Sequence, residues 1–138
     1  MEKQAQHFSL KLDKDIVIFK GYGVWKHALS LACIESINEV VSSQNKQPFA
    51  LIVDTSEVKS LTPQCFNEWE VAIDSWSKVG LKVTARIDKP EASFYKIFLS
   101  GFDNILRMNT KFYTSSTESY ALKSLHQSGF LGFEDNSE

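Results

Sequence analysis

The stretch FALIVDTSEVKSLTPQCFNEW, Phe49–Trp69, contains the signals that decide the fold. Its first part, FALIVD (Phe49–Asp54), is apolar at both odd and even positions, which is typical of a central strand covered by helices on both sides. The polar residues that follow, Thr55–Gln64, predict a loop. Thr62-Pro63 then places a capping hydroxyl before a proline at the first helical position. The stretch therefore predicts a buried strand, a loop and a helix in succession.

Strand and helix patterns alternate on either side of this stretch. HFSLKL (His7–Leu12) and IVIFKG (Ile16–Gly21) predict an antiparallel hairpin, because a short polar link joins two strand patterns. Apolar residues between Ala28 and Val41 recur at helical spacing. After the second helix, which ends at Gly80, the patterns predict a strand at Leu81–Asp88, a helix from about Glu91 to Asn104, a strand at Met108–Thr114 and a helix over Ser115–Gln127, where Ser115 and Glu118 form a capping box. The predicted order ββαβαβαβα is that of an α/β fold with a mixed sheet, in which parallel strands follow the opening hairpin.

The composition fits one soluble domain. The chain has 138 residues, of which 43% are hydrophobic and 23% charged. We expect a single domain over residues 1–133 and an acidic tail at 134–138. The net charge of −2 gives no basic footprint for nucleic acid. The sequence shows neither a membrane-spanning apolar run nor a signal peptide, and two cysteines fit a reducing compartment, so we predict a cytoplasmic protein without integral membrane insertion.

The order of elements, together with Asp54-Thr55-Ser56-Glu57-Val58, carries a resemblance to a known family. Many STAS domains have a strand that ends in Asp, followed by a residue, Ser, another residue and Val. From about His7 to Leu131 the chain resembles the STAS domain, the fold of the sporulation anti-sigma-factor antagonist SpoIIAA and of lipid-binding relatives. The resemblance implies a SpoIIAA-like fold in a bacterial regulatory protein. It also implies a regulatory loop, for which the candidate residues here are Asp54, Thr55, Ser56, Ser60 and Thr62.

The chain departs from the family pattern at the start of the second helix. The resemblance places the phosphoacceptor serine at Pro63 or Gln64, and neither residue can accept a phosphoryl group. Cys65 replaces the glycine expected at the head of that helix. Thr62 is the nearest hydroxyl, and capping its own helix explains it. We therefore predict that the scaffold is kept and the phosphorylation switch is lost.

The reactive residue types do not form a recognisable catalytic or metal motif. His7, His27 and His126 lack metal-ligand spacing, and we expect no metal, no cofactor and no catalytic residue. Cys65 would lie in the first turn of a helix, where the dipole lowers the pKa of a thiol. A thiol-dependent enzyme is therefore one alternative, and an inert cysteine packed under the loop is the other.

Aromatic residues are the strongest remaining signal. The third helix is apolar around more than half of its circumference, so it either packs on a second chain or walls an apolar cavity. The predicted interaction or ligand surface consists of Phe66, Trp69, Phe94, Tyr95, Phe98 and Phe102. We predict a non-catalytic regulatory or protein-interaction domain that self-associates as a homodimer or binds another protein. The alternative is a carrier of a small lipophilic ligand held between the third helix and the sheet.

Overall fold

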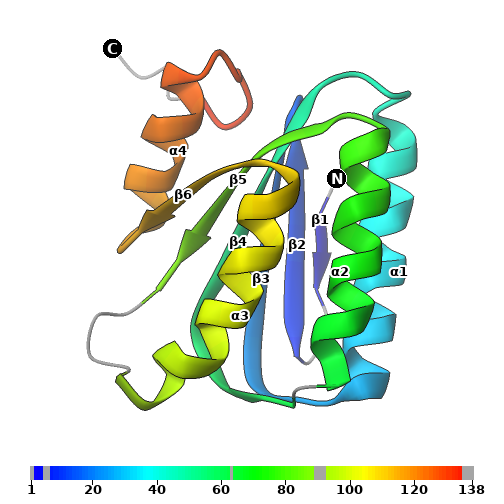
Figure 1. Ribbon diagram of the computed structural model, residues 1–138. Coiled ribbons are helices and arrows are strands. Elements are labelled where there is room, and N and C mark those ends of the chain that lie inside the picture. Colours follow the sequence, from blue (N-terminus) through cyan, green and yellow to red (C-terminus); the bar gives the residue numbers. More distant parts are fainter. Residues whose placement is uncertain (1, 5–6, 63, 89–92, 135–138) are drawn as a thin grey trace.

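In the described part of the chain, the sheet has six strands that lie side by side in their order along the chain (Figure 1). The computed structural model describes residues 2–4, 7–62, 64–88 and 93–134, with the backbone alone described at 2–4, 60–61, 64 and 93–99. The strands are β1 (Glu2–Gln4), β2 (Phe8–Asp13), β3 (Ile16–Trp25), β4 (Phe49–Leu61), β5 (Leu81–Ile87) and β6 (Lys111–Ser115). β1, β2 and β3 pair antiparallel, whereas β3 to β6 pair parallel. The predicted mixed sheet is confirmed, and β1 is a strand that the sequence patterns missed.

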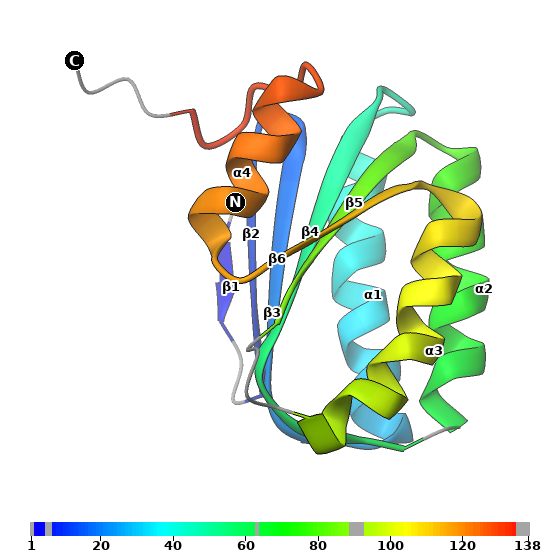
Figure 2. The ribbon, with the colours of Figure 1, turned by 60° about the vertical axis from the view of Figure 1, so that its left-hand side comes forward.

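Helices cover both faces of the sheet. α1 (His27–Ser43), α2 (Gln64–Lys78) and α3 (Ser93–Asn109) lie together on one face, and α4 (Glu118–Gln127) lies on the other (Figure 2). Phe49, Leu51 and Val53 of β4 belong to the core under the three helices, and Ala50 and Ile52 belong to the core under α4. The start of β4 is apolar on both sides because each side faces a core covered by helices, as predicted. Among the helices of the described residues, none is long and apolar enough to cross a membrane.

β4 is longer than its apolar run predicted. It continues through the polar residues to Leu61, so the predicted loop at Thr55–Gln64 is wrong over most of its length. The physical reason is that β3 also continues, through Tyr22 to Trp25, and its backbone pairs with β4 as far as Leu61. Side chains still alternate in the extension, because Val58 packs against the core while its neighbours are exposed.

An aromatic cluster fills the core beneath α1, α2 and α3. Trp69 lies at its centre, with ring centroids 5.8 Å from Phe19, 6.2 Å from Trp25, 6.3 Å from Trp76 and 5.8 Å from Phe102. These distances are those of favourable tilted and edge-to-face pairs. The cluster therefore ties α2 to both α3 and the strand β3.

The ends of the last three elements differ from the predictions. α3 continues to Asn109 because Ile105 and Leu106 remain buried in the core, and β6 begins only at Lys111. Thr117, and not Ser115, caps α4, where its hydroxyl accepts a hydrogen bond from the Tyr120 N–H. The predicted start of the third helix lies at residues outside the described part of the chain.

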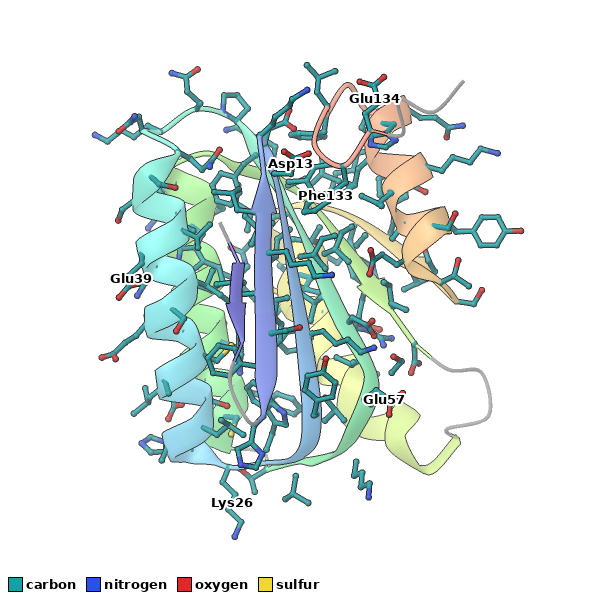
Figure 3. All side chains as sticks on the ribbon, turned by 180° about the vertical axis from the view of Figure 1, so that it is seen from behind. Asp13, Lys26, Glu39, Glu57, Phe133 and Glu134 are labelled. Atoms are coloured by element: carbon teal, nitrogen blue, oxygen red, sulfur yellow. The ribbon has the colours of Figure 1, made fainter. Side chains whose placement is uncertain are left out.

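The segment after α4 is held against the β2–β3 turn. The Asp15 carboxylate accepts the N–H groups of Leu131 and Gly132 at 2.9 and 2.8 Å, and Asp13 accepts the N–H of Phe133 at 2.7 Å. Asp13 and Phe133 lie beside each other at one end of the sheet (Figure 3). These bonds fix residues 131–133 to the domain. Most of the predicted acidic tail, 135–138, lies outside the described residues.

Candidate functional site

Of the predicted regulatory residues, Asp54, Thr55, Ser56 and Ser60 lie on β4, and Thr62 follows the end of this strand. Asp54 is 5% exposed, and its Oδ1 accepts hydrogen bonds from the Ser56 N–H at 2.9 Å and from Ser56 Oγ at 2.6 Å. Thr55 is also buried, but its hydroxyl donates to the carbonyl of Ile87. Successive strand residues point to opposite faces of the sheet. The side chains of Asp54 and Thr55 therefore lie on opposite faces of the sheet. The side chain of Ser60 is outside the described part of the structure.

Thr62 lies immediately before α2, as predicted. Its Oγ1 is 3.1 Å from Cys65 Sγ, and its carbonyl accepts the Cys65 N–H at 3.0 Å. Pro63 lies outside the described residues, and Gln64 is described only by its backbone. The hydroxyl therefore makes a local contact at the head of the helix, which fits a structural role.

Both cysteines are buried in the core. Cys33 and Cys65 are each 0% exposed. Burial raises the pKa of the Cys33 thiol well above its ordinary value, because the thiolate would be desolvated. This position of Cys65 matches the inert-packing alternative rather than an accessible nucleophile.

Native protein should therefore react slowly with iodoacetamide at neutral pH. Because alkylation needs an accessible thiolate, we expect both cysteines to react at least about tenfold more slowly than a free thiol. In denaturing urea both should react at the free rate. Mass spectrometry of the labelled protein measures the two cysteines separately. Fast labelling of Cys65 in the native protein would contradict the inert-packing interpretation and support the thiol-enzyme alternative.

A buried ion-pair network at the carboxyl end of β5, beside Thr55 of β4, was not predicted from the sequence. The Arg86 guanidinium is bound by Asp103 of α3 through two hydrogen bonds, of which the Nη2–Oδ2 contact is 2.8 Å. Its Nη1 lies 3.2 Å from Thr55 Oγ1 and 3.4 Å from Asp88 Oδ2. Burial lowers the pKa of Arg86, but the hydrogen bonds and charges of Asp103 and Asp88 raise it overall, so Arg86 stays protonated.

A polar hollow of about 460 Å³ opens beside this network. It lies where parallel α/β sheets commonly bind ligands, at the carboxyl ends of strands. Among the described residues, its lining consists of Arg86, Asp88, Ser100, Asp103, Thr114, Ser115 and Ser116. Charged and hydroxyl side chains of this kind favour a polar ligand, and the lipophilic ligand that the alternative places between α3 and the sheet stays a prediction.

The aromatic residues predicted to form an interaction surface are largely internal. Trp69 is 2% and Phe102 4% exposed, so neither can contact a partner, and this part of the prediction is wrong. Phe66 is half-buried against Gly101 of α3. The reason is that Trp69 and Phe102 meet each other in the core, and Phe66 packs against the same core. Phe94, Tyr95 and Phe98 lie outside the residues whose side chains are described.

A different apolar surface runs across the same three helices. Leu31 of α1, Val71 of α2 and Met108 of α3 are 43%, 64% and 80% exposed. Leu31 and Val71 line one hollow of about 360 Å³ between α1 and α2. Val71 and Met108 line a second of about 400 Å³ between α2 and α3. We call this surface, centred on Leu31, Val71 and Met108, the three-helix surface.

Carboxylates surround the three-helix surface. Glu68 lines the hollow between α1 and α2, where its Oε1 contacts His27. Its Oε2 is buried and has no hydrogen-bond partner within the described part of the chain. Glu70 and Asp74 line the second hollow. Glu39 lies on the outer side of α1 (Figure 3). The surface thus combines exposed apolar side chains with negative charge.

Comparison with known proteins supports the fold. No protein-family model matches the sequence, and no curated protein matches it. The structure is similar to an anti-sigma factor antagonist from Mycobacterium paratuberculosis, with a TM-score of 0.59 and 18% identity over 86% of this chain and 92% of that chain. It is similar to a DUF3478-family protein with a SpoIIAA-like fold from Shewanella loihica, with a TM-score of 0.60 and 13% identity over 89% and 98%.

A third similar structure is the anti-sigma factor antagonist SpoIIAA in its unphosphorylated form. It has a TM-score of 0.62 and 13% identity, and the match covers 89% of this chain and 99% of that chain. The three matches span almost the whole length of each compared protein. The resemblance inferred from the sequence is confirmed at the level of the fold: this chain has the SpoIIAA-like α/β fold.

Proposed function

We propose that this chain is a non-catalytic regulatory domain of the bacterial cytoplasm that works by binding another protein through the three-helix surface. The observation that carries the proposal is the alignment of Leu31, Val71 and Met108 along two neighbouring hollows. Exposed apolar side chains that line neighbouring hollows among polar residues are typical of interaction sites. Two of the similar structures are anti-sigma factor antagonists, which is consistent with a regulatory role.

The size of the surface is sufficient for a moderate affinity. Covering a few hundred Å² of apolar area, at about 25 cal/mol per Å², supplies several kcal/mol before the cost of association. Hot spots are few, so one well-placed side chain can dominate. Val71 is the best candidate, because it borders both hollows.

Val71→Glu should weaken binding of the partner about tenfold or more, because the new carboxylate must lose water against an apolar contact. Val71 is well exposed, so the free energy of unfolding should change by less than about 0.5 kcal/mol. The measurement is isothermal titration of the purified partner, after its isolation by affinity purification and identification. Tyr120→Glu on α4 is the matched control, since Tyr120 is 61% exposed on the opposite face of the sheet. Equal losses from the two variants would refute the proposed surface.

The predicted homodimer is not assigned to this surface. An isologous interface would place the carboxylates of one copy against those of the other, and like charges across an interface are unfavourable. Self-association through the start of α3, at Phe94, Tyr95 and Phe98, stays a prediction. A thiol enzyme at Cys65 and a lipophilic carrier are both less well supported, for the burial and polarity described above.

A further inference from the structure

We infer that the partner presents a basic segment with apolar side chains to the three-helix surface, and that a Lys or Arg of this segment binds Glu68. This inference rests on the proposed function and adds the chemistry of the partner. Three observations carry it: the charge of the two helices, the unpaired oxygen of Glu68, and the apolar wall beside that oxygen.

The charge of the chain is distributed unevenly. α1 has the carboxylates Glu35 and Glu39 and no Lys or Arg, which gives −2. α2 has Glu68, Glu70 and Asp74 against Lys78, which also gives −2. The two helices therefore carry −4, whereas the chain as a whole carries −2, so the rest of the protein is +2. A positively charged partner is therefore attracted to the α1–α2 side of the molecule more than to α3, where Lys96 and Arg107 against Asp103 give +1.

Within this negative surface, Glu68 has unsatisfied acceptor capacity. Its side chain is only 15% exposed, and Oε2 has no hydrogen-bond partner among the described residues. A buried carboxylate oxygen without a donor costs free energy, and such exceptions call for a specific explanation. His27 contacts only the other oxygen. Glu68 lines the hollow between α1 and α2, so a rotation of its carboxylate would turn Oε2 toward a guanidinium or ammonium group seated there, which would satisfy it through a charge-assisted hydrogen bond.

The hollow around Glu68 also has a place for an apolar side chain. Leu31, Ile34, Val71 and Ala72 line it together with Glu68. An amphipathic segment with its apolar residues about one helical turn apart fits a groove between two helices. Its basic residues would then lie over Glu68 and the carboxylates at the rim. A second copy of this chain is a poor occupant, because its own matching helices carry the same negative charge.

Two synthetic peptides test the inference with the full chain. Each is a helical peptide of about 15 residues with leucines on one face. One carries Lys and Arg on the other face, and its match carries Glu at the same positions. Two-dimensional NMR titration of the amide resonances measures affinity and location together. We expect the basic peptide to bind about tenfold or more tightly than the acidic one and to shift resonances of α1 and α2.

Two variants separate a specific contact from general attraction. Glu68→Gln and Glu118→Gln change the net charge equally, but Glu118 lies on α4. Glu68→Gln should weaken the basic peptide about tenfold, and Glu118→Gln by less than about twofold. Glu68→Gln keeps the shape of the side chain and an oxygen that can accept a hydrogen bond from His27, so the fold should be kept, which an unchanged dispersion of the amide resonances checks. The inference would be overturned if the two variants had equal effects or if the two peptides bound equally. It would also be overturned if the shifted resonances were confined to α4 and to the strands β2 and β3.

The inference and the proposed function can fail separately. If Val71→Glu blocks the isolated partner but Glu68→Gln leaves that binding unchanged, the surface is correct and the basic contact is wrong. If Val71→Glu leaves the partner's affinity unchanged, the proposed surface fails, and with it the inference.

Discussion

Asp103→Ala should lower the free energy of unfolding by about 3–5 kcal/mol. The variant leaves the Arg86 guanidinium buried, with a side chain only 6% exposed, and removes the carboxylate that binds it through two hydrogen bonds. Thr55 and Asp88 remain within reach, but neither offers the paired geometry of Asp103. Urea unfolding followed by tryptophan fluorescence measures the loss.

Two control variants test whether the stability loss of Asp103→Ala comes from leaving Arg86 without its partner or from any substitution of a helical aspartate. The double variant Arg86→Met/Asp103→Leu removes both charges of this pair, and it should recover part of the lost stability, because only Asp88, with a side chain 16% exposed, then lacks its partner. Asp74→Asn breaks an exposed pair with Lys78 and should cost less than about 0.5 kcal/mol. If Asp103→Ala is as mild as Asp74→Asn, the network is not formed in solution.

Trp69→Ala should also cost about 3–5 kcal/mol, through lost burial and the cavity that remains. Trp69 contacts aromatic rings from β3, α2 and α3, so its loss loosens the packing of three elements at once. Trp69→Phe should cost less, since it keeps an aromatic ring but removes the indole N–H that donates to Ser30 Oγ at 3.2 Å. Thermal and urea unfolding of the two variants measure the order of these effects.

Met108→Ala is the control for this second prediction. Met108 is 80% exposed at the end of α3, and its truncation should change stability by less than about 0.5 kcal/mol. A Trp69→Ala variant as stable as Met108→Ala would mean that Trp69 lies on the surface, as the sequence pattern suggested.

The sequence predicted the architecture because the main signals are local. Phe49–Asp54 is apolar on both faces, and the structure places a core on each side of it. The helical spacing after Lys26 and after Thr62 likewise predicted α1 and α2. Each of these patterns reports the environment of its own segment, and each was confirmed.

Features that depend on distant partners were not predictable in this way. The extension of β4 to Leu61 depends on pairing with β3, whose own extension through Gly21–Trp25 contains two glycines that indicate a turn when read alone. Arg86 and Asp103 are separated by 17 positions and lie on different elements. The alternation of apolar and polar residues in LKVTARID does not predict that Arg86 is buried.

The candidate site shows both kinds of outcome. Trp69 and Phe102 were assigned to an interaction or ligand surface because the third helix is apolar around more than half of its circumference, yet the two rings meet each other in the core. Val71 was missed, although the sequence carried a signal for it. The apolar stripe of α2 includes Trp69, Ile73 and Trp76, and a valine between Trp69 and Ile73 lies off that stripe.

The most direct test of the account is hydrogen–deuterium exchange of the purified complex with its protein partner, compared with the free chain. The account predicts slower exchange in α1 and α2, around Leu31 and Val71, with α4 and β6 unchanged. Protection confined to α4, β6 or the uncovered side of β2 and β3 would contradict the central claim that the three-helix surface binds the partner.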